Sequence, residues 1–544
     1  IMTGSSRGQT PSLQSRRRFL RQSMQLGAVG AIGASGLWLP ARVAAQSSPS
    51  SVVEIDTGRV RGYVNEGVSV FKGIPYGAST ARENRFRPPQ PATAWTGIRE
   101  SVEYGPTAPQ TLGSDGQLAA GQSEDCLVIN VWTPEANSNR KRPVMFWCHG
   151  GGFTSLSGSS PSYDGTNLCN RGDVVVVTVN HRLNIMGFTH LAELGGEPFA
   201  HAGTAGMLDL VAALQWVQRN IEQFGGDPDN VMIFGESGGG RKVGTLLAMP
   251  AAKGLFHRAV IQSGPTIRLA SAEAGTRQAT SLFEQLGLQT GDMQGLQNAP
   301  VERIIAAYQA ISRTSSFAPV VDGDALPASP FHPTASAVNP DVPLIVGANR
   351  TELTLQMRGD TEAFNLDEAT MMQRLQSILG DMTREVVDVY RSAEPDASPS
   401  ELFFLIVSDR AYVVPCTVIA ERRAALNAAP VRSYYLTWET QTLDGRLMTP
   451  HALDIPFVFD NTHAERTVYG FTTGTAEERA MADKISDSWI SFARSGNPDT
   501  GKLPDWPVYT GASRQVMVLN NESQVVEDPI RERRQVMQRV LNLA

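Results

Sequence analysis

The stretch VMIFGESGGGRKVGT, residues 231–245, joins an apolar run to a glycine-rich turn and a helix-like segment. The run VMIF is typical of a strand covered on both faces, and residues 242–249 are typical of a helix. A serine at a sharp strand-to-helix turn presents its hydroxyl outward, and flanking glycines leave room for the strained backbone. Ser237 is therefore either a nucleophile or a structural serine in a glycine-rich turn, and the pentapeptide alone favours neither.

Short apolar runs recur along the chain, with helical patterns between them. The other predicted strands are VMFWC (144–148), VVVVTV (174–179), AVIQ (259–262), PLIVG (343–347), SYYLTW (433–438) and VMVL (516–519). Apolar residues from Gly206 to Phe224 recur near a 3.6-residue period, which predicts a helix. Strands that alternate with helices predict an α/β fold with a mostly parallel sheet. A hairpin is expected around Thr57-Gly58, and residues 360–430 read as a mostly helical, more polar insertion over one end of the sheet.

The first 45 residues are typical of an export signal. The segment SRRRFLR (15–21) precedes a weakly apolar stretch from Met24 to Leu39, and Val43-Ala44-Ala45 follows. This order predicts a twin-arginine signal cleaved after Ala45, and hence a periplasmic or secreted protein. The alternative is a membrane helix, but glycines and Pro40 interrupt a run shorter than the roughly 20 apolar residues that a span needs. Residues 46–544 are expected to form one domain without a stable membrane anchor.

Charge and cysteine content exclude several classes of function. The formal net charge is −7, and removal of residues 1–45, which hold six arginines and no acidic residue, makes it −13. An acidic chain is a poor partner for nucleic acid or an anionic membrane. The four cysteines (126, 148, 169 and 416) show no CxxC spacing, so neither a zinc site nor a disulfide scaffold is indicated. We expect no metal and no cofactor, and nothing in the sequence sets the oligomeric state.

A second glycine-rich loop follows another predicted strand. In CHGGGF (148–153), three glycines leave a bare backbone whose N–H groups could join that of Gly238 to bind an oxyanion. The alternative is a phosphate-binding loop, but the spacing does not match Gly-x-Gly-x-x-Gly, and no Gly-Lys-Ser/Thr follows. The loop therefore favours a nucleophilic role for Ser237.

A nucleophilic serine needs a base and an acid that orients it. In the chain order Ser, acid, His, the candidates for the base are the histidines after Ser237, namely His257, His332, His451 and His463. His451 is the best placed, because its loop enters the apolar block ALDIPFVF. For the acid, Glu352 lies just past a predicted strand end, where α/β sheets present catalytic groups. Asp409 and Asp322 remain alternatives for the acid.

Many ordered motifs resemble those of the type-B carboxylesterases, the cholinesterase-like or para-nitrobenzyl-esterase-like α/β-hydrolases. The resemblance rests on FKGIPYG (71–77), RFRPPQP (85–91), SEDCLVINVWTP (123–134), HGGGF (149–153), VVVVTVNHRL (174–183), ALQWVQRNIEQFGGDPDNVMIFGESGGG (213–240), GLFHRAVIQSG (254–264), NRTE (349–352), HALDIPFVF (451–459) and SWISFARSGNP (488–498). It implies an α/β-hydrolase fold with helical insertions over the active site.

The resemblance also implies roles for individual residues. Ser237 would be the nucleophile, Glu352 the acid and His451 the base. The oxyanion donors would be the backbone N–H groups of Gly151, Gly152 and Gly238, and Ser263 would be a hydroxyl that supports the acid. The implied activity is hydrolysis of a small-molecule carboxylic ester through an acyl-enzyme. The alternatives are a non-catalytic binding protein of the same family and a hydrolase that acts mainly on amides or thioesters.

The sequence departs from the family pattern at several positions. Gly238 stands where alanine is common, and Ala108 stands where many members have the cysteine that pairs with the equivalent of Cys126, so Cys126 is expected to be unpaired. His181 replaces a usual tyrosine, and we expect it to be packed and hydrogen-bonded. Arg241 and Lys242 either attract a substrate carboxylate or belong to a salt bridge or solvated turn at the helix start. The second interpretation is favoured, and because cations at a helix start oppose its dipole, Glu236 or Asp209 could serve as acidic partners.

Overall fold

A computed structural model describes residues 48–543 of the chain, and the predicted export signal, residues 1–45, lies outside the described residues. The strands are β1 (Pro49–Ile55), β2 (Gly58–Asn65), β3 (Val68–Pro75), β4 (Ile98–Glu100), β5 (Val128–Thr133), β6 (Arg142–Cys148), β7 (Val175–Val179), β8 (Gly226–Glu236), β9 (Arg258–Gln262), β10 (Ala270–Ser271), β11 (Val320–Val321), β12 (Leu344–Asn349), β13 (Val431–Leu436), β14 (Gln515–Leu519) and β15 (Gln524–Glu527). All seven predicted apolar runs are strands.

One large mixed sheet organises the chain. Its 13 strands run in the order β1-β2-β3-β5-β7-β6-β8-β9-β12-β13-β14-β15, with β4 beside β2. The strands from β7 to β14 pair in parallel, and the strands at the two ends of the sheet pair mostly antiparallel. The predicted mostly parallel sheet is confirmed for this central part, and the predicted hairpin is the β1–β2 turn, where Ile55 pairs with Gly58.

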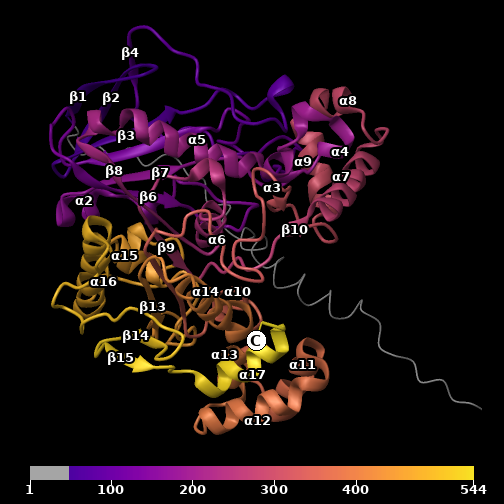
Figure 1. The fold of residues 1–544 in the computed structure, drawn as a ribbon, viewed down its shortest axis with the longest axis vertical. Helices are drawn as coiled ribbons and strands as arrows, with labels where there is room; N and C mark the ends of the chain where they lie inside the picture. The colour runs from indigo at the N-terminus through magenta and orange to yellow at the C-terminus, as the bar shows by residue number, and fades with distance from the viewer. Residues whose placement is uncertain (1–47, 544) are drawn as a thin grey trace, which may run out of the picture.

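Helices cover both faces of the sheet. They are α2 (Thr166–Gly172), α3 (Asn184–Phe188), α4 (Ala192–Gly195), α5 (Ala205–Asn220), α6 (Gly238–Leu246), α7 (Ala272–Leu286), α8 (Met293–Asn298), α9 (Val301–Ile311), α10 (Leu353–Gln356), α11 (Glu368–Leu379), α12 (Thr383–Ala393), α13 (Pro399–Ser408), α14 (Val414–Ala424), α15 (Asp454–Val458), α16 (Ala476–Ser495) and α17 (Arg531–Leu541). In Figure 1, α2, α15 and α16 lie on one side of the central strands, and α6 and α14 lie on the other.

The central strands read as unbroken apolar runs because both of their faces are buried. In β6, Val144 and Phe146 belong to one core cluster, whereas Met145 and Trp147 belong to a second cluster. Alternate side chains therefore enter the two layers of helices, and all residues of this strand are buried. At the centre of the sheet, β6 and β8 pair with each other and end in the two glycine-rich loops.

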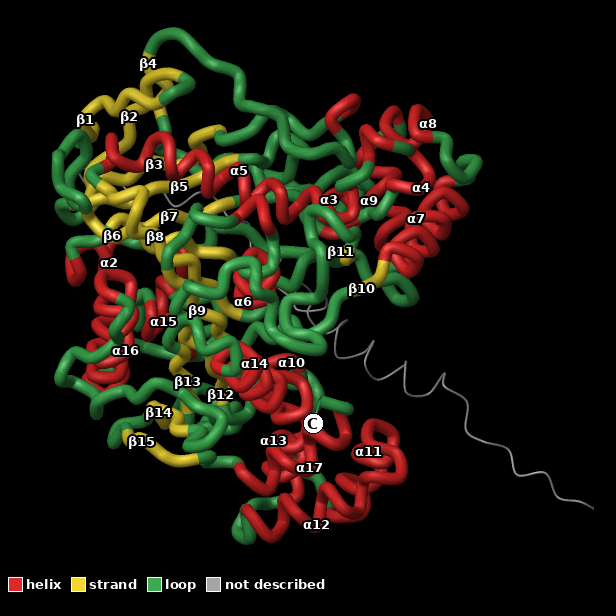
Figure 2. Tube along the Cα trace, viewed as in Figure 1, coloured by secondary structure: helices red, strands yellow, loops and turns green. Residues whose placement is uncertain are grey.

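The segment 360–430 is mostly helical, as predicted, and it forms α11 to α14. Figure 2 shows α11, α12 and α13 gathered with α17 at one end of the molecule. The expectation that this segment is polar is wrong for α13, whose residues Leu402–Val407 are all buried. The continuous helical stretch Pro399–Ala424 is long and apolar enough to cross a membrane by length and composition, but 78% of its most apolar window is buried inside the fold, as in a core helix.

All four cysteines are buried and unpaired. The expectation that Cys126 lacks a partner is therefore confirmed, and Ala108 is a buried core residue. Burial disfavours the charged thiolate and raises the pKa of each thiol, to about 12 for Cys148. The fold of the described residues is thus held by packing and hydrogen bonds rather than by disulfides.

Candidate active site

Ser237 occupies a strained turn between β8 and α6. Its backbone angles are φ 57° and ψ −120°, and it is the residue that precedes the first turn of α6. A non-glycine residue rarely adopts a positive φ, so the surrounding structure must hold it there; the Ser237 N–H donates to the Gln262 carbonyl at 2.8 Å. The helix starts at Gly238, earlier than the predicted Lys242, so its positive end lies directly beneath the serine.

The two glycine-rich loops contact each other backbone to backbone. A Cβ atom at Gly238 would lie 2.2 Å from the Gly152 carbonyl oxygen, and one at Gly239 would lie 1.9 Å from the Cys148 carbonyl oxygen. Gly151 and Gly152 have positive φ values of 80° and 64°. Within residues 48–543, no group accepts a hydrogen bond from the backbone N–H of Gly151, Gly152 or Gly238, which leaves these donors for a ligand.

Glu352 and His451 form a buried acid–base pair. His451 Nδ1 lies 2.5 Å from Glu352 Oε2, and the Asn349 N–H donates to Glu352 Oε1 at 2.7 Å. Because a carboxylate accepts hydrogen bonds, Nδ1 carries the proton and donates the hydrogen bond to Glu352. Nε2 is then the basic nitrogen when the ring is neutral. The Glu352 side chain is fully buried, so its position is fixed by the loops around it.

These two residues, 99 positions apart, meet because hydrogen bonds join their loops. The Thr351 N–H donates to the Thr449 carbonyl at 3.1 Å, and the Thr449 N–H donates to Thr351 Oγ1 at 2.9 Å. Asn349 Nδ2 donates to the Pro450 carbonyl at 2.8 Å. The loop after β12 thus carries the acid and fixes the loop that carries the histidine.

Glu236, the last residue of β8, is the principal site residue that sequence reasoning missed. Its Oε1 lies 3.1 Å from His451 Nε2, but the two atoms are not aligned for a hydrogen bond. Burial raises the pKa of Glu236 to about 8. Burial opposes the charged form of His451, yet the carboxylates of Glu236 and Glu352 and the nearby Tyr412 raise the pKa of the imidazole above its usual value. The protonation of Glu236 is therefore coupled to that of His451.

Nε2 of His451 has no hydrogen-bond partner in the part of the chain that the structure describes. In particular, no hydrogen bond joins it to the Ser237 hydroxyl, a contact that in unliganded enzymes is often long and tightens on binding. The ring of Tyr412 packs against the His451 ring, with centroids 4.7 Å apart. The imidazole is thus held by Glu352 and flanked by Tyr412, with one nitrogen available for proton transfer.

The rival candidates for the base and the acid lie elsewhere in the fold. His257 Nδ1 accepts a hydrogen bond from the Val231 N–H, and His332 precedes a cis proline. His463 lies in an exposed loop. Asp409 is engaged by Arg533, and Asp322 lies near His201 and Thr204. The structure brings none of these five to His451 or Ser237.

Ser263 lies in a strained position with φ 46° and is fully buried. Its N–H donates to the Gly347 carbonyl at 2.9 Å, but its hydroxyl has no hydrogen-bond partner among residues 48–543. The Asn349 N–H, not Ser263, supports the Glu352 carboxylate by a hydrogen bond. The resemblance implied that Ser263 supports Glu352, but no hydrogen bond joins the two residues in the structure.

Neither of the two cations after the serine forms the expected salt bridge. Lys242 is fully buried, and its Nζ donates to the His149 carbonyl at 2.7 Å. Arg241 has a buried Nε without a hydrogen-bond partner. Neither cation forms a salt bridge with any described residue: Asp209 is bound by Arg182, and Glu236 faces His451. The salt-bridge interpretation is therefore wrong for Glu236 and Asp209, and a substrate-facing role is wrong for Lys242.

His181 is packed and hydrogen-bonded, as expected.

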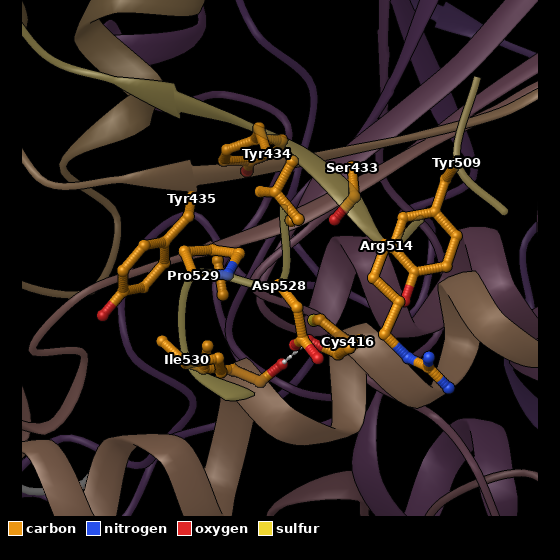
Figure 3. Close-up of a pocket in the computed structure, with 14 residues that line it drawn as sticks. Cys416, Ser433, Tyr434, Tyr435, Tyr509, Arg514, Asp528, Pro529 and Ile530 are labelled. Carbon is orange, nitrogen blue, oxygen red and sulfur yellow. Dashed lines mark hydrogen bonds between the residues drawn. The ribbon is translucent and has the colours of Figure 1, made fainter. Parts of the chain in front are cut away.

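A cavity elsewhere in the fold is not the site of this chemistry. It lies between strands β12 to β14 and helix α14. Figure 3 shows Cys416, Ser433, Tyr509, Arg514 and Asp528 around it. Ser237, Glu352 and His451 do not line this cavity. Within the described range, no cluster of histidine, cysteine or acidic side chains could hold a metal ion.

Comparison with known proteins identifies the family. Residues 49–538 match the model of the carboxylesterase family. The chain is 34% identical over 496 residues to a para-nitrobenzyl esterase of Bacillus subtilis, covering 89% of this chain and 98% of that one. It is 32% identical over 524 residues to a human cocaine esterase, covering 88% and 90% of the two chains.

The solved structures agree with the sequence comparison. A crystal structure of a Geobacillus stearothermophilus carboxylesterase superposes with a TM-score of 0.80 at 39% identity, covering 90% of this chain and all of that one. This likeness, together with the mixed sheet and its two layers of helices, confirms the expected α/β-hydrolase fold. The chain belongs to the carboxylesterase family and is a carboxylic ester hydrolase.

Proposed function

We propose that the chain hydrolyses carboxylic esters through an acyl-enzyme formed on Ser237. The observation that carries this proposal is the Glu352–His451 contact of 2.5 Å, with the second imidazole nitrogen unpartnered. His451 Nε2 takes the Ser237 proton as the serine oxygen attacks the ester carbonyl carbon, and the carbonyl oxygen becomes an oxyanion. Glu352 orients the imidazole and stabilises its positive charge.

The oxyanion is received by the backbone N–H groups of Gly151, Gly152 and Gly238. The support for this assignment is that these donors lack acceptors among the described residues and that the two loops that carry them are in contact. The start of α6 adds a positive dipole end at the same place. The imidazolium then gives its proton to the leaving alcohol. Water, activated by His451, attacks the acyl carbon and releases the acid, and the Ser237 hydroxyl is restored.

Glu236 gives the site a second carboxyl group beside the imidazole. In its charged form it favours the imidazolium electrostatically, and it is not placed to bind the nitrogen by an aligned hydrogen bond. We infer that Glu236 stabilises the imidazolium that forms during both proton transfers, without replacing Ser237 as the partner of Nε2. The substrates that we propose are small uncharged esters; the relatives' names point to para-nitrobenzyl esters and cocaine as esters that those proteins cleave.

The test is the substitution Ser237→Ala, assayed with para-nitrophenyl acetate. We expect kcat to fall on the order of 10⁴-fold or more, because the covalent step is lost while the fold is kept. A fluorophosphonate probe should label the natural chain and not the variant, and the thermal unfolding temperature should change little. Retained turnover in Ser237→Ala would show that another group is the nucleophile. A panel of esters, thioesters and amides with the natural chain would rank the bond types.

A further inference from the structure

Lys242 is a fully buried lysine without an acidic partner. Its Nζ donates a hydrogen bond to the backbone carbonyl of His149 at 2.7 Å, and no described carboxylate lies within ion-pair distance. A buried charge is costly unless it is paired, and a methionine of similar length would fill the same space at lower cost. The lysine is therefore a poor choice for packing alone.

The groups that face Lys242 come from β6, the loop after β6 and the loop after β7. They are the Cys148 thiol and the imidazoles of His149 and His181. The two rings stack at a centroid distance of 5.1 Å, and each Nδ1 contacts a backbone carbonyl. Burial, with Lys242 nearby, lowers the pKa of both imidazoles well below its usual value, so both are neutral. Burial also lowers the pKa of Lys242 to about 7.

The position of this hydrogen bond connects the two loops of the proposed oxyanion hole. Lys242 stands one helical turn after Gly238 on α6. The His149 carbonyl belongs to the peptide group that leads into Gly150, Gly151 and Gly152. Because Gly238 and Gly239 lack side chains, the loop after β6 rests directly on the α6 backbone. The Lys242 side chain joins the two by its hydrogen bond from α6 to the loop after β6.

We propose that Lys242 is a positioning residue for the oxyanion hole, which holds the Gly151 and Gly152 N–H groups in register with that of Gly238 through the His149 carbonyl. The inference rests on the proposed function. The fully buried Lys242 side chain makes its hydrogen bond to the His149 carbonyl and not to the serine. Its contribution is realised when the oxyanion forms, because only then are the three donors used together.

The test compares Lys242→Met with the natural chain on a neutral ester. We expect kcat to fall about 10- to 100-fold, less than the 10²–10³-fold typical for loss of an oxyanion donor, while KM stays within about twofold. A trifluoromethyl ketone, whose hemiketal places an oxyanion in the hole, should bind more weakly by a similar factor. The unfolding temperature should not fall, because methionine removes a buried unpaired cation.

A matched control is Arg423→Met. Arg423 is also a buried cation that donates to backbone carbonyls, those of Asn339, Pro340 and Val342, at the far end of α14. We expect this variant to lose stability, because three carbonyls lose their donor where Lys242→Met leaves only one without it, and to keep its kcat. If both variants lose kcat and stability alike, the Lys242 bond is merely structural and the proposal is wrong.

Two further outcomes decide the proposal. If Lys242→Met keeps kcat and the affinity for the ketone within twofold of the natural values, Lys242 does not position the hole. If Lys242→Met does not fold, Lys242→Gln is tested instead, because it keeps a polar group at the position. The same result is expected, a lower kcat with little change in KM. Failure of the proposed function itself is recognised separately, because Ser237→Ala would then remain active.

Discussion

At the scale of single residues, Glu236, which lies outside the expected triad, affects proton transfer by His451. Glu236 Oε1 is 3.1 Å from His451 Nε2, and its negative charge raises the pKa of the imidazole. A base with a raised pKa is protonated, and so inactive, up to a higher pH. The acid limb of the pH–rate profile should therefore report on Glu236.

We expect Glu236→Gln to shift the acid limb of kcat/KM to lower pH. The substitution removes the group whose charged form, populated as the pH rises through its raised pKa of about 8, favours the imidazolium. The pKa of His451 therefore falls, and the base is free at lower pH. The measurement is kcat/KM for a neutral ester between about pH 5 and 9. Glu193→Gln is the matched control, because Glu193 lies 3.1 Å from another histidine, His190, outside the site. An unchanged acid limb in Glu236→Gln would contradict the assignment.

Local patterns make Ser237, Glu352 and His451 candidates, because each residue follows a strand end or enters an apolar block, and the family resemblance selects them among their rivals. Glu236 could not be found in that way, since its partner lies 215 positions later in the chain. A useful signal was nevertheless present: the residue just before a nucleophile at a strand end lies beside it on the same turn. The partner of Lys242 cannot be predicted from the sequence, because it is the His149 carbonyl and no side-chain pattern reveals a backbone acceptor.

At the scale of elements, the contact between α6 and the loop after β6 depends on the absence of side chains. Gly239 is the tightest point, with a built Cβ only 1.9 Å from the Cys148 carbonyl oxygen. The sequence predicted both glycine-rich loops and the strands before them. It could not predict their separation, because that distance is set by how β6 and β8 pair in the sheet.

Gly239→Ala should destabilise the fold by about 1–3 kcal/mol, because the added methyl group forces two backbones apart. Esterase activity should fall as well, since the oxyanion donors move with the loop. Urea unfolding and kcat are the measurements. Gly359→Ala is the control: a Cβ there meets no atom within 4 Å, so its free energy of unfolding should change by less than about 0.5 kcal/mol. Equal stability of the two variants would contradict the close approach.

At the scale of the whole molecule, the carboxyl-terminal helix α17 is tied to the helical insertion by a buried ion pair. Arg533 Nε lies 2.9 Å from Asp409 Oδ2, and Tyr390 also donates its hydroxyl to this carboxylate. Periodicity predicted helices in residues 360–430 but not this contact, which joins residues 124 positions apart. The same limit applies to β3 and β5, which extend the sheet beyond the predicted strands. The export signal, residues 1–45, stays a prediction.

Arg533→Met should lower the free energy of unfolding by about 3–5 kcal/mol, because it leaves the Asp409 carboxylate buried and uncompensated. Urea denaturation is the measurement. The double variant Arg533→Met with Asp409→Leu should recover part of this loss, since it removes both charges together. If the double variant is less stable than the sum of the two single changes, the pair does not act as a coupled unit.

The burial of all four cysteines has a practical consequence for spectroscopy. Thiol reagents react with the accessible thiolate, and each native thiol is enclosed with a raised pKa. A cysteine introduced at an exposed position, such as Leu156, whose residue surface is 42% accessible, would then be the fast-reacting thiol of the chain. A fluorophore or spin label could be attached there without first removing any native cysteine, and its signal would report on the loop beside the glycine-rich turn.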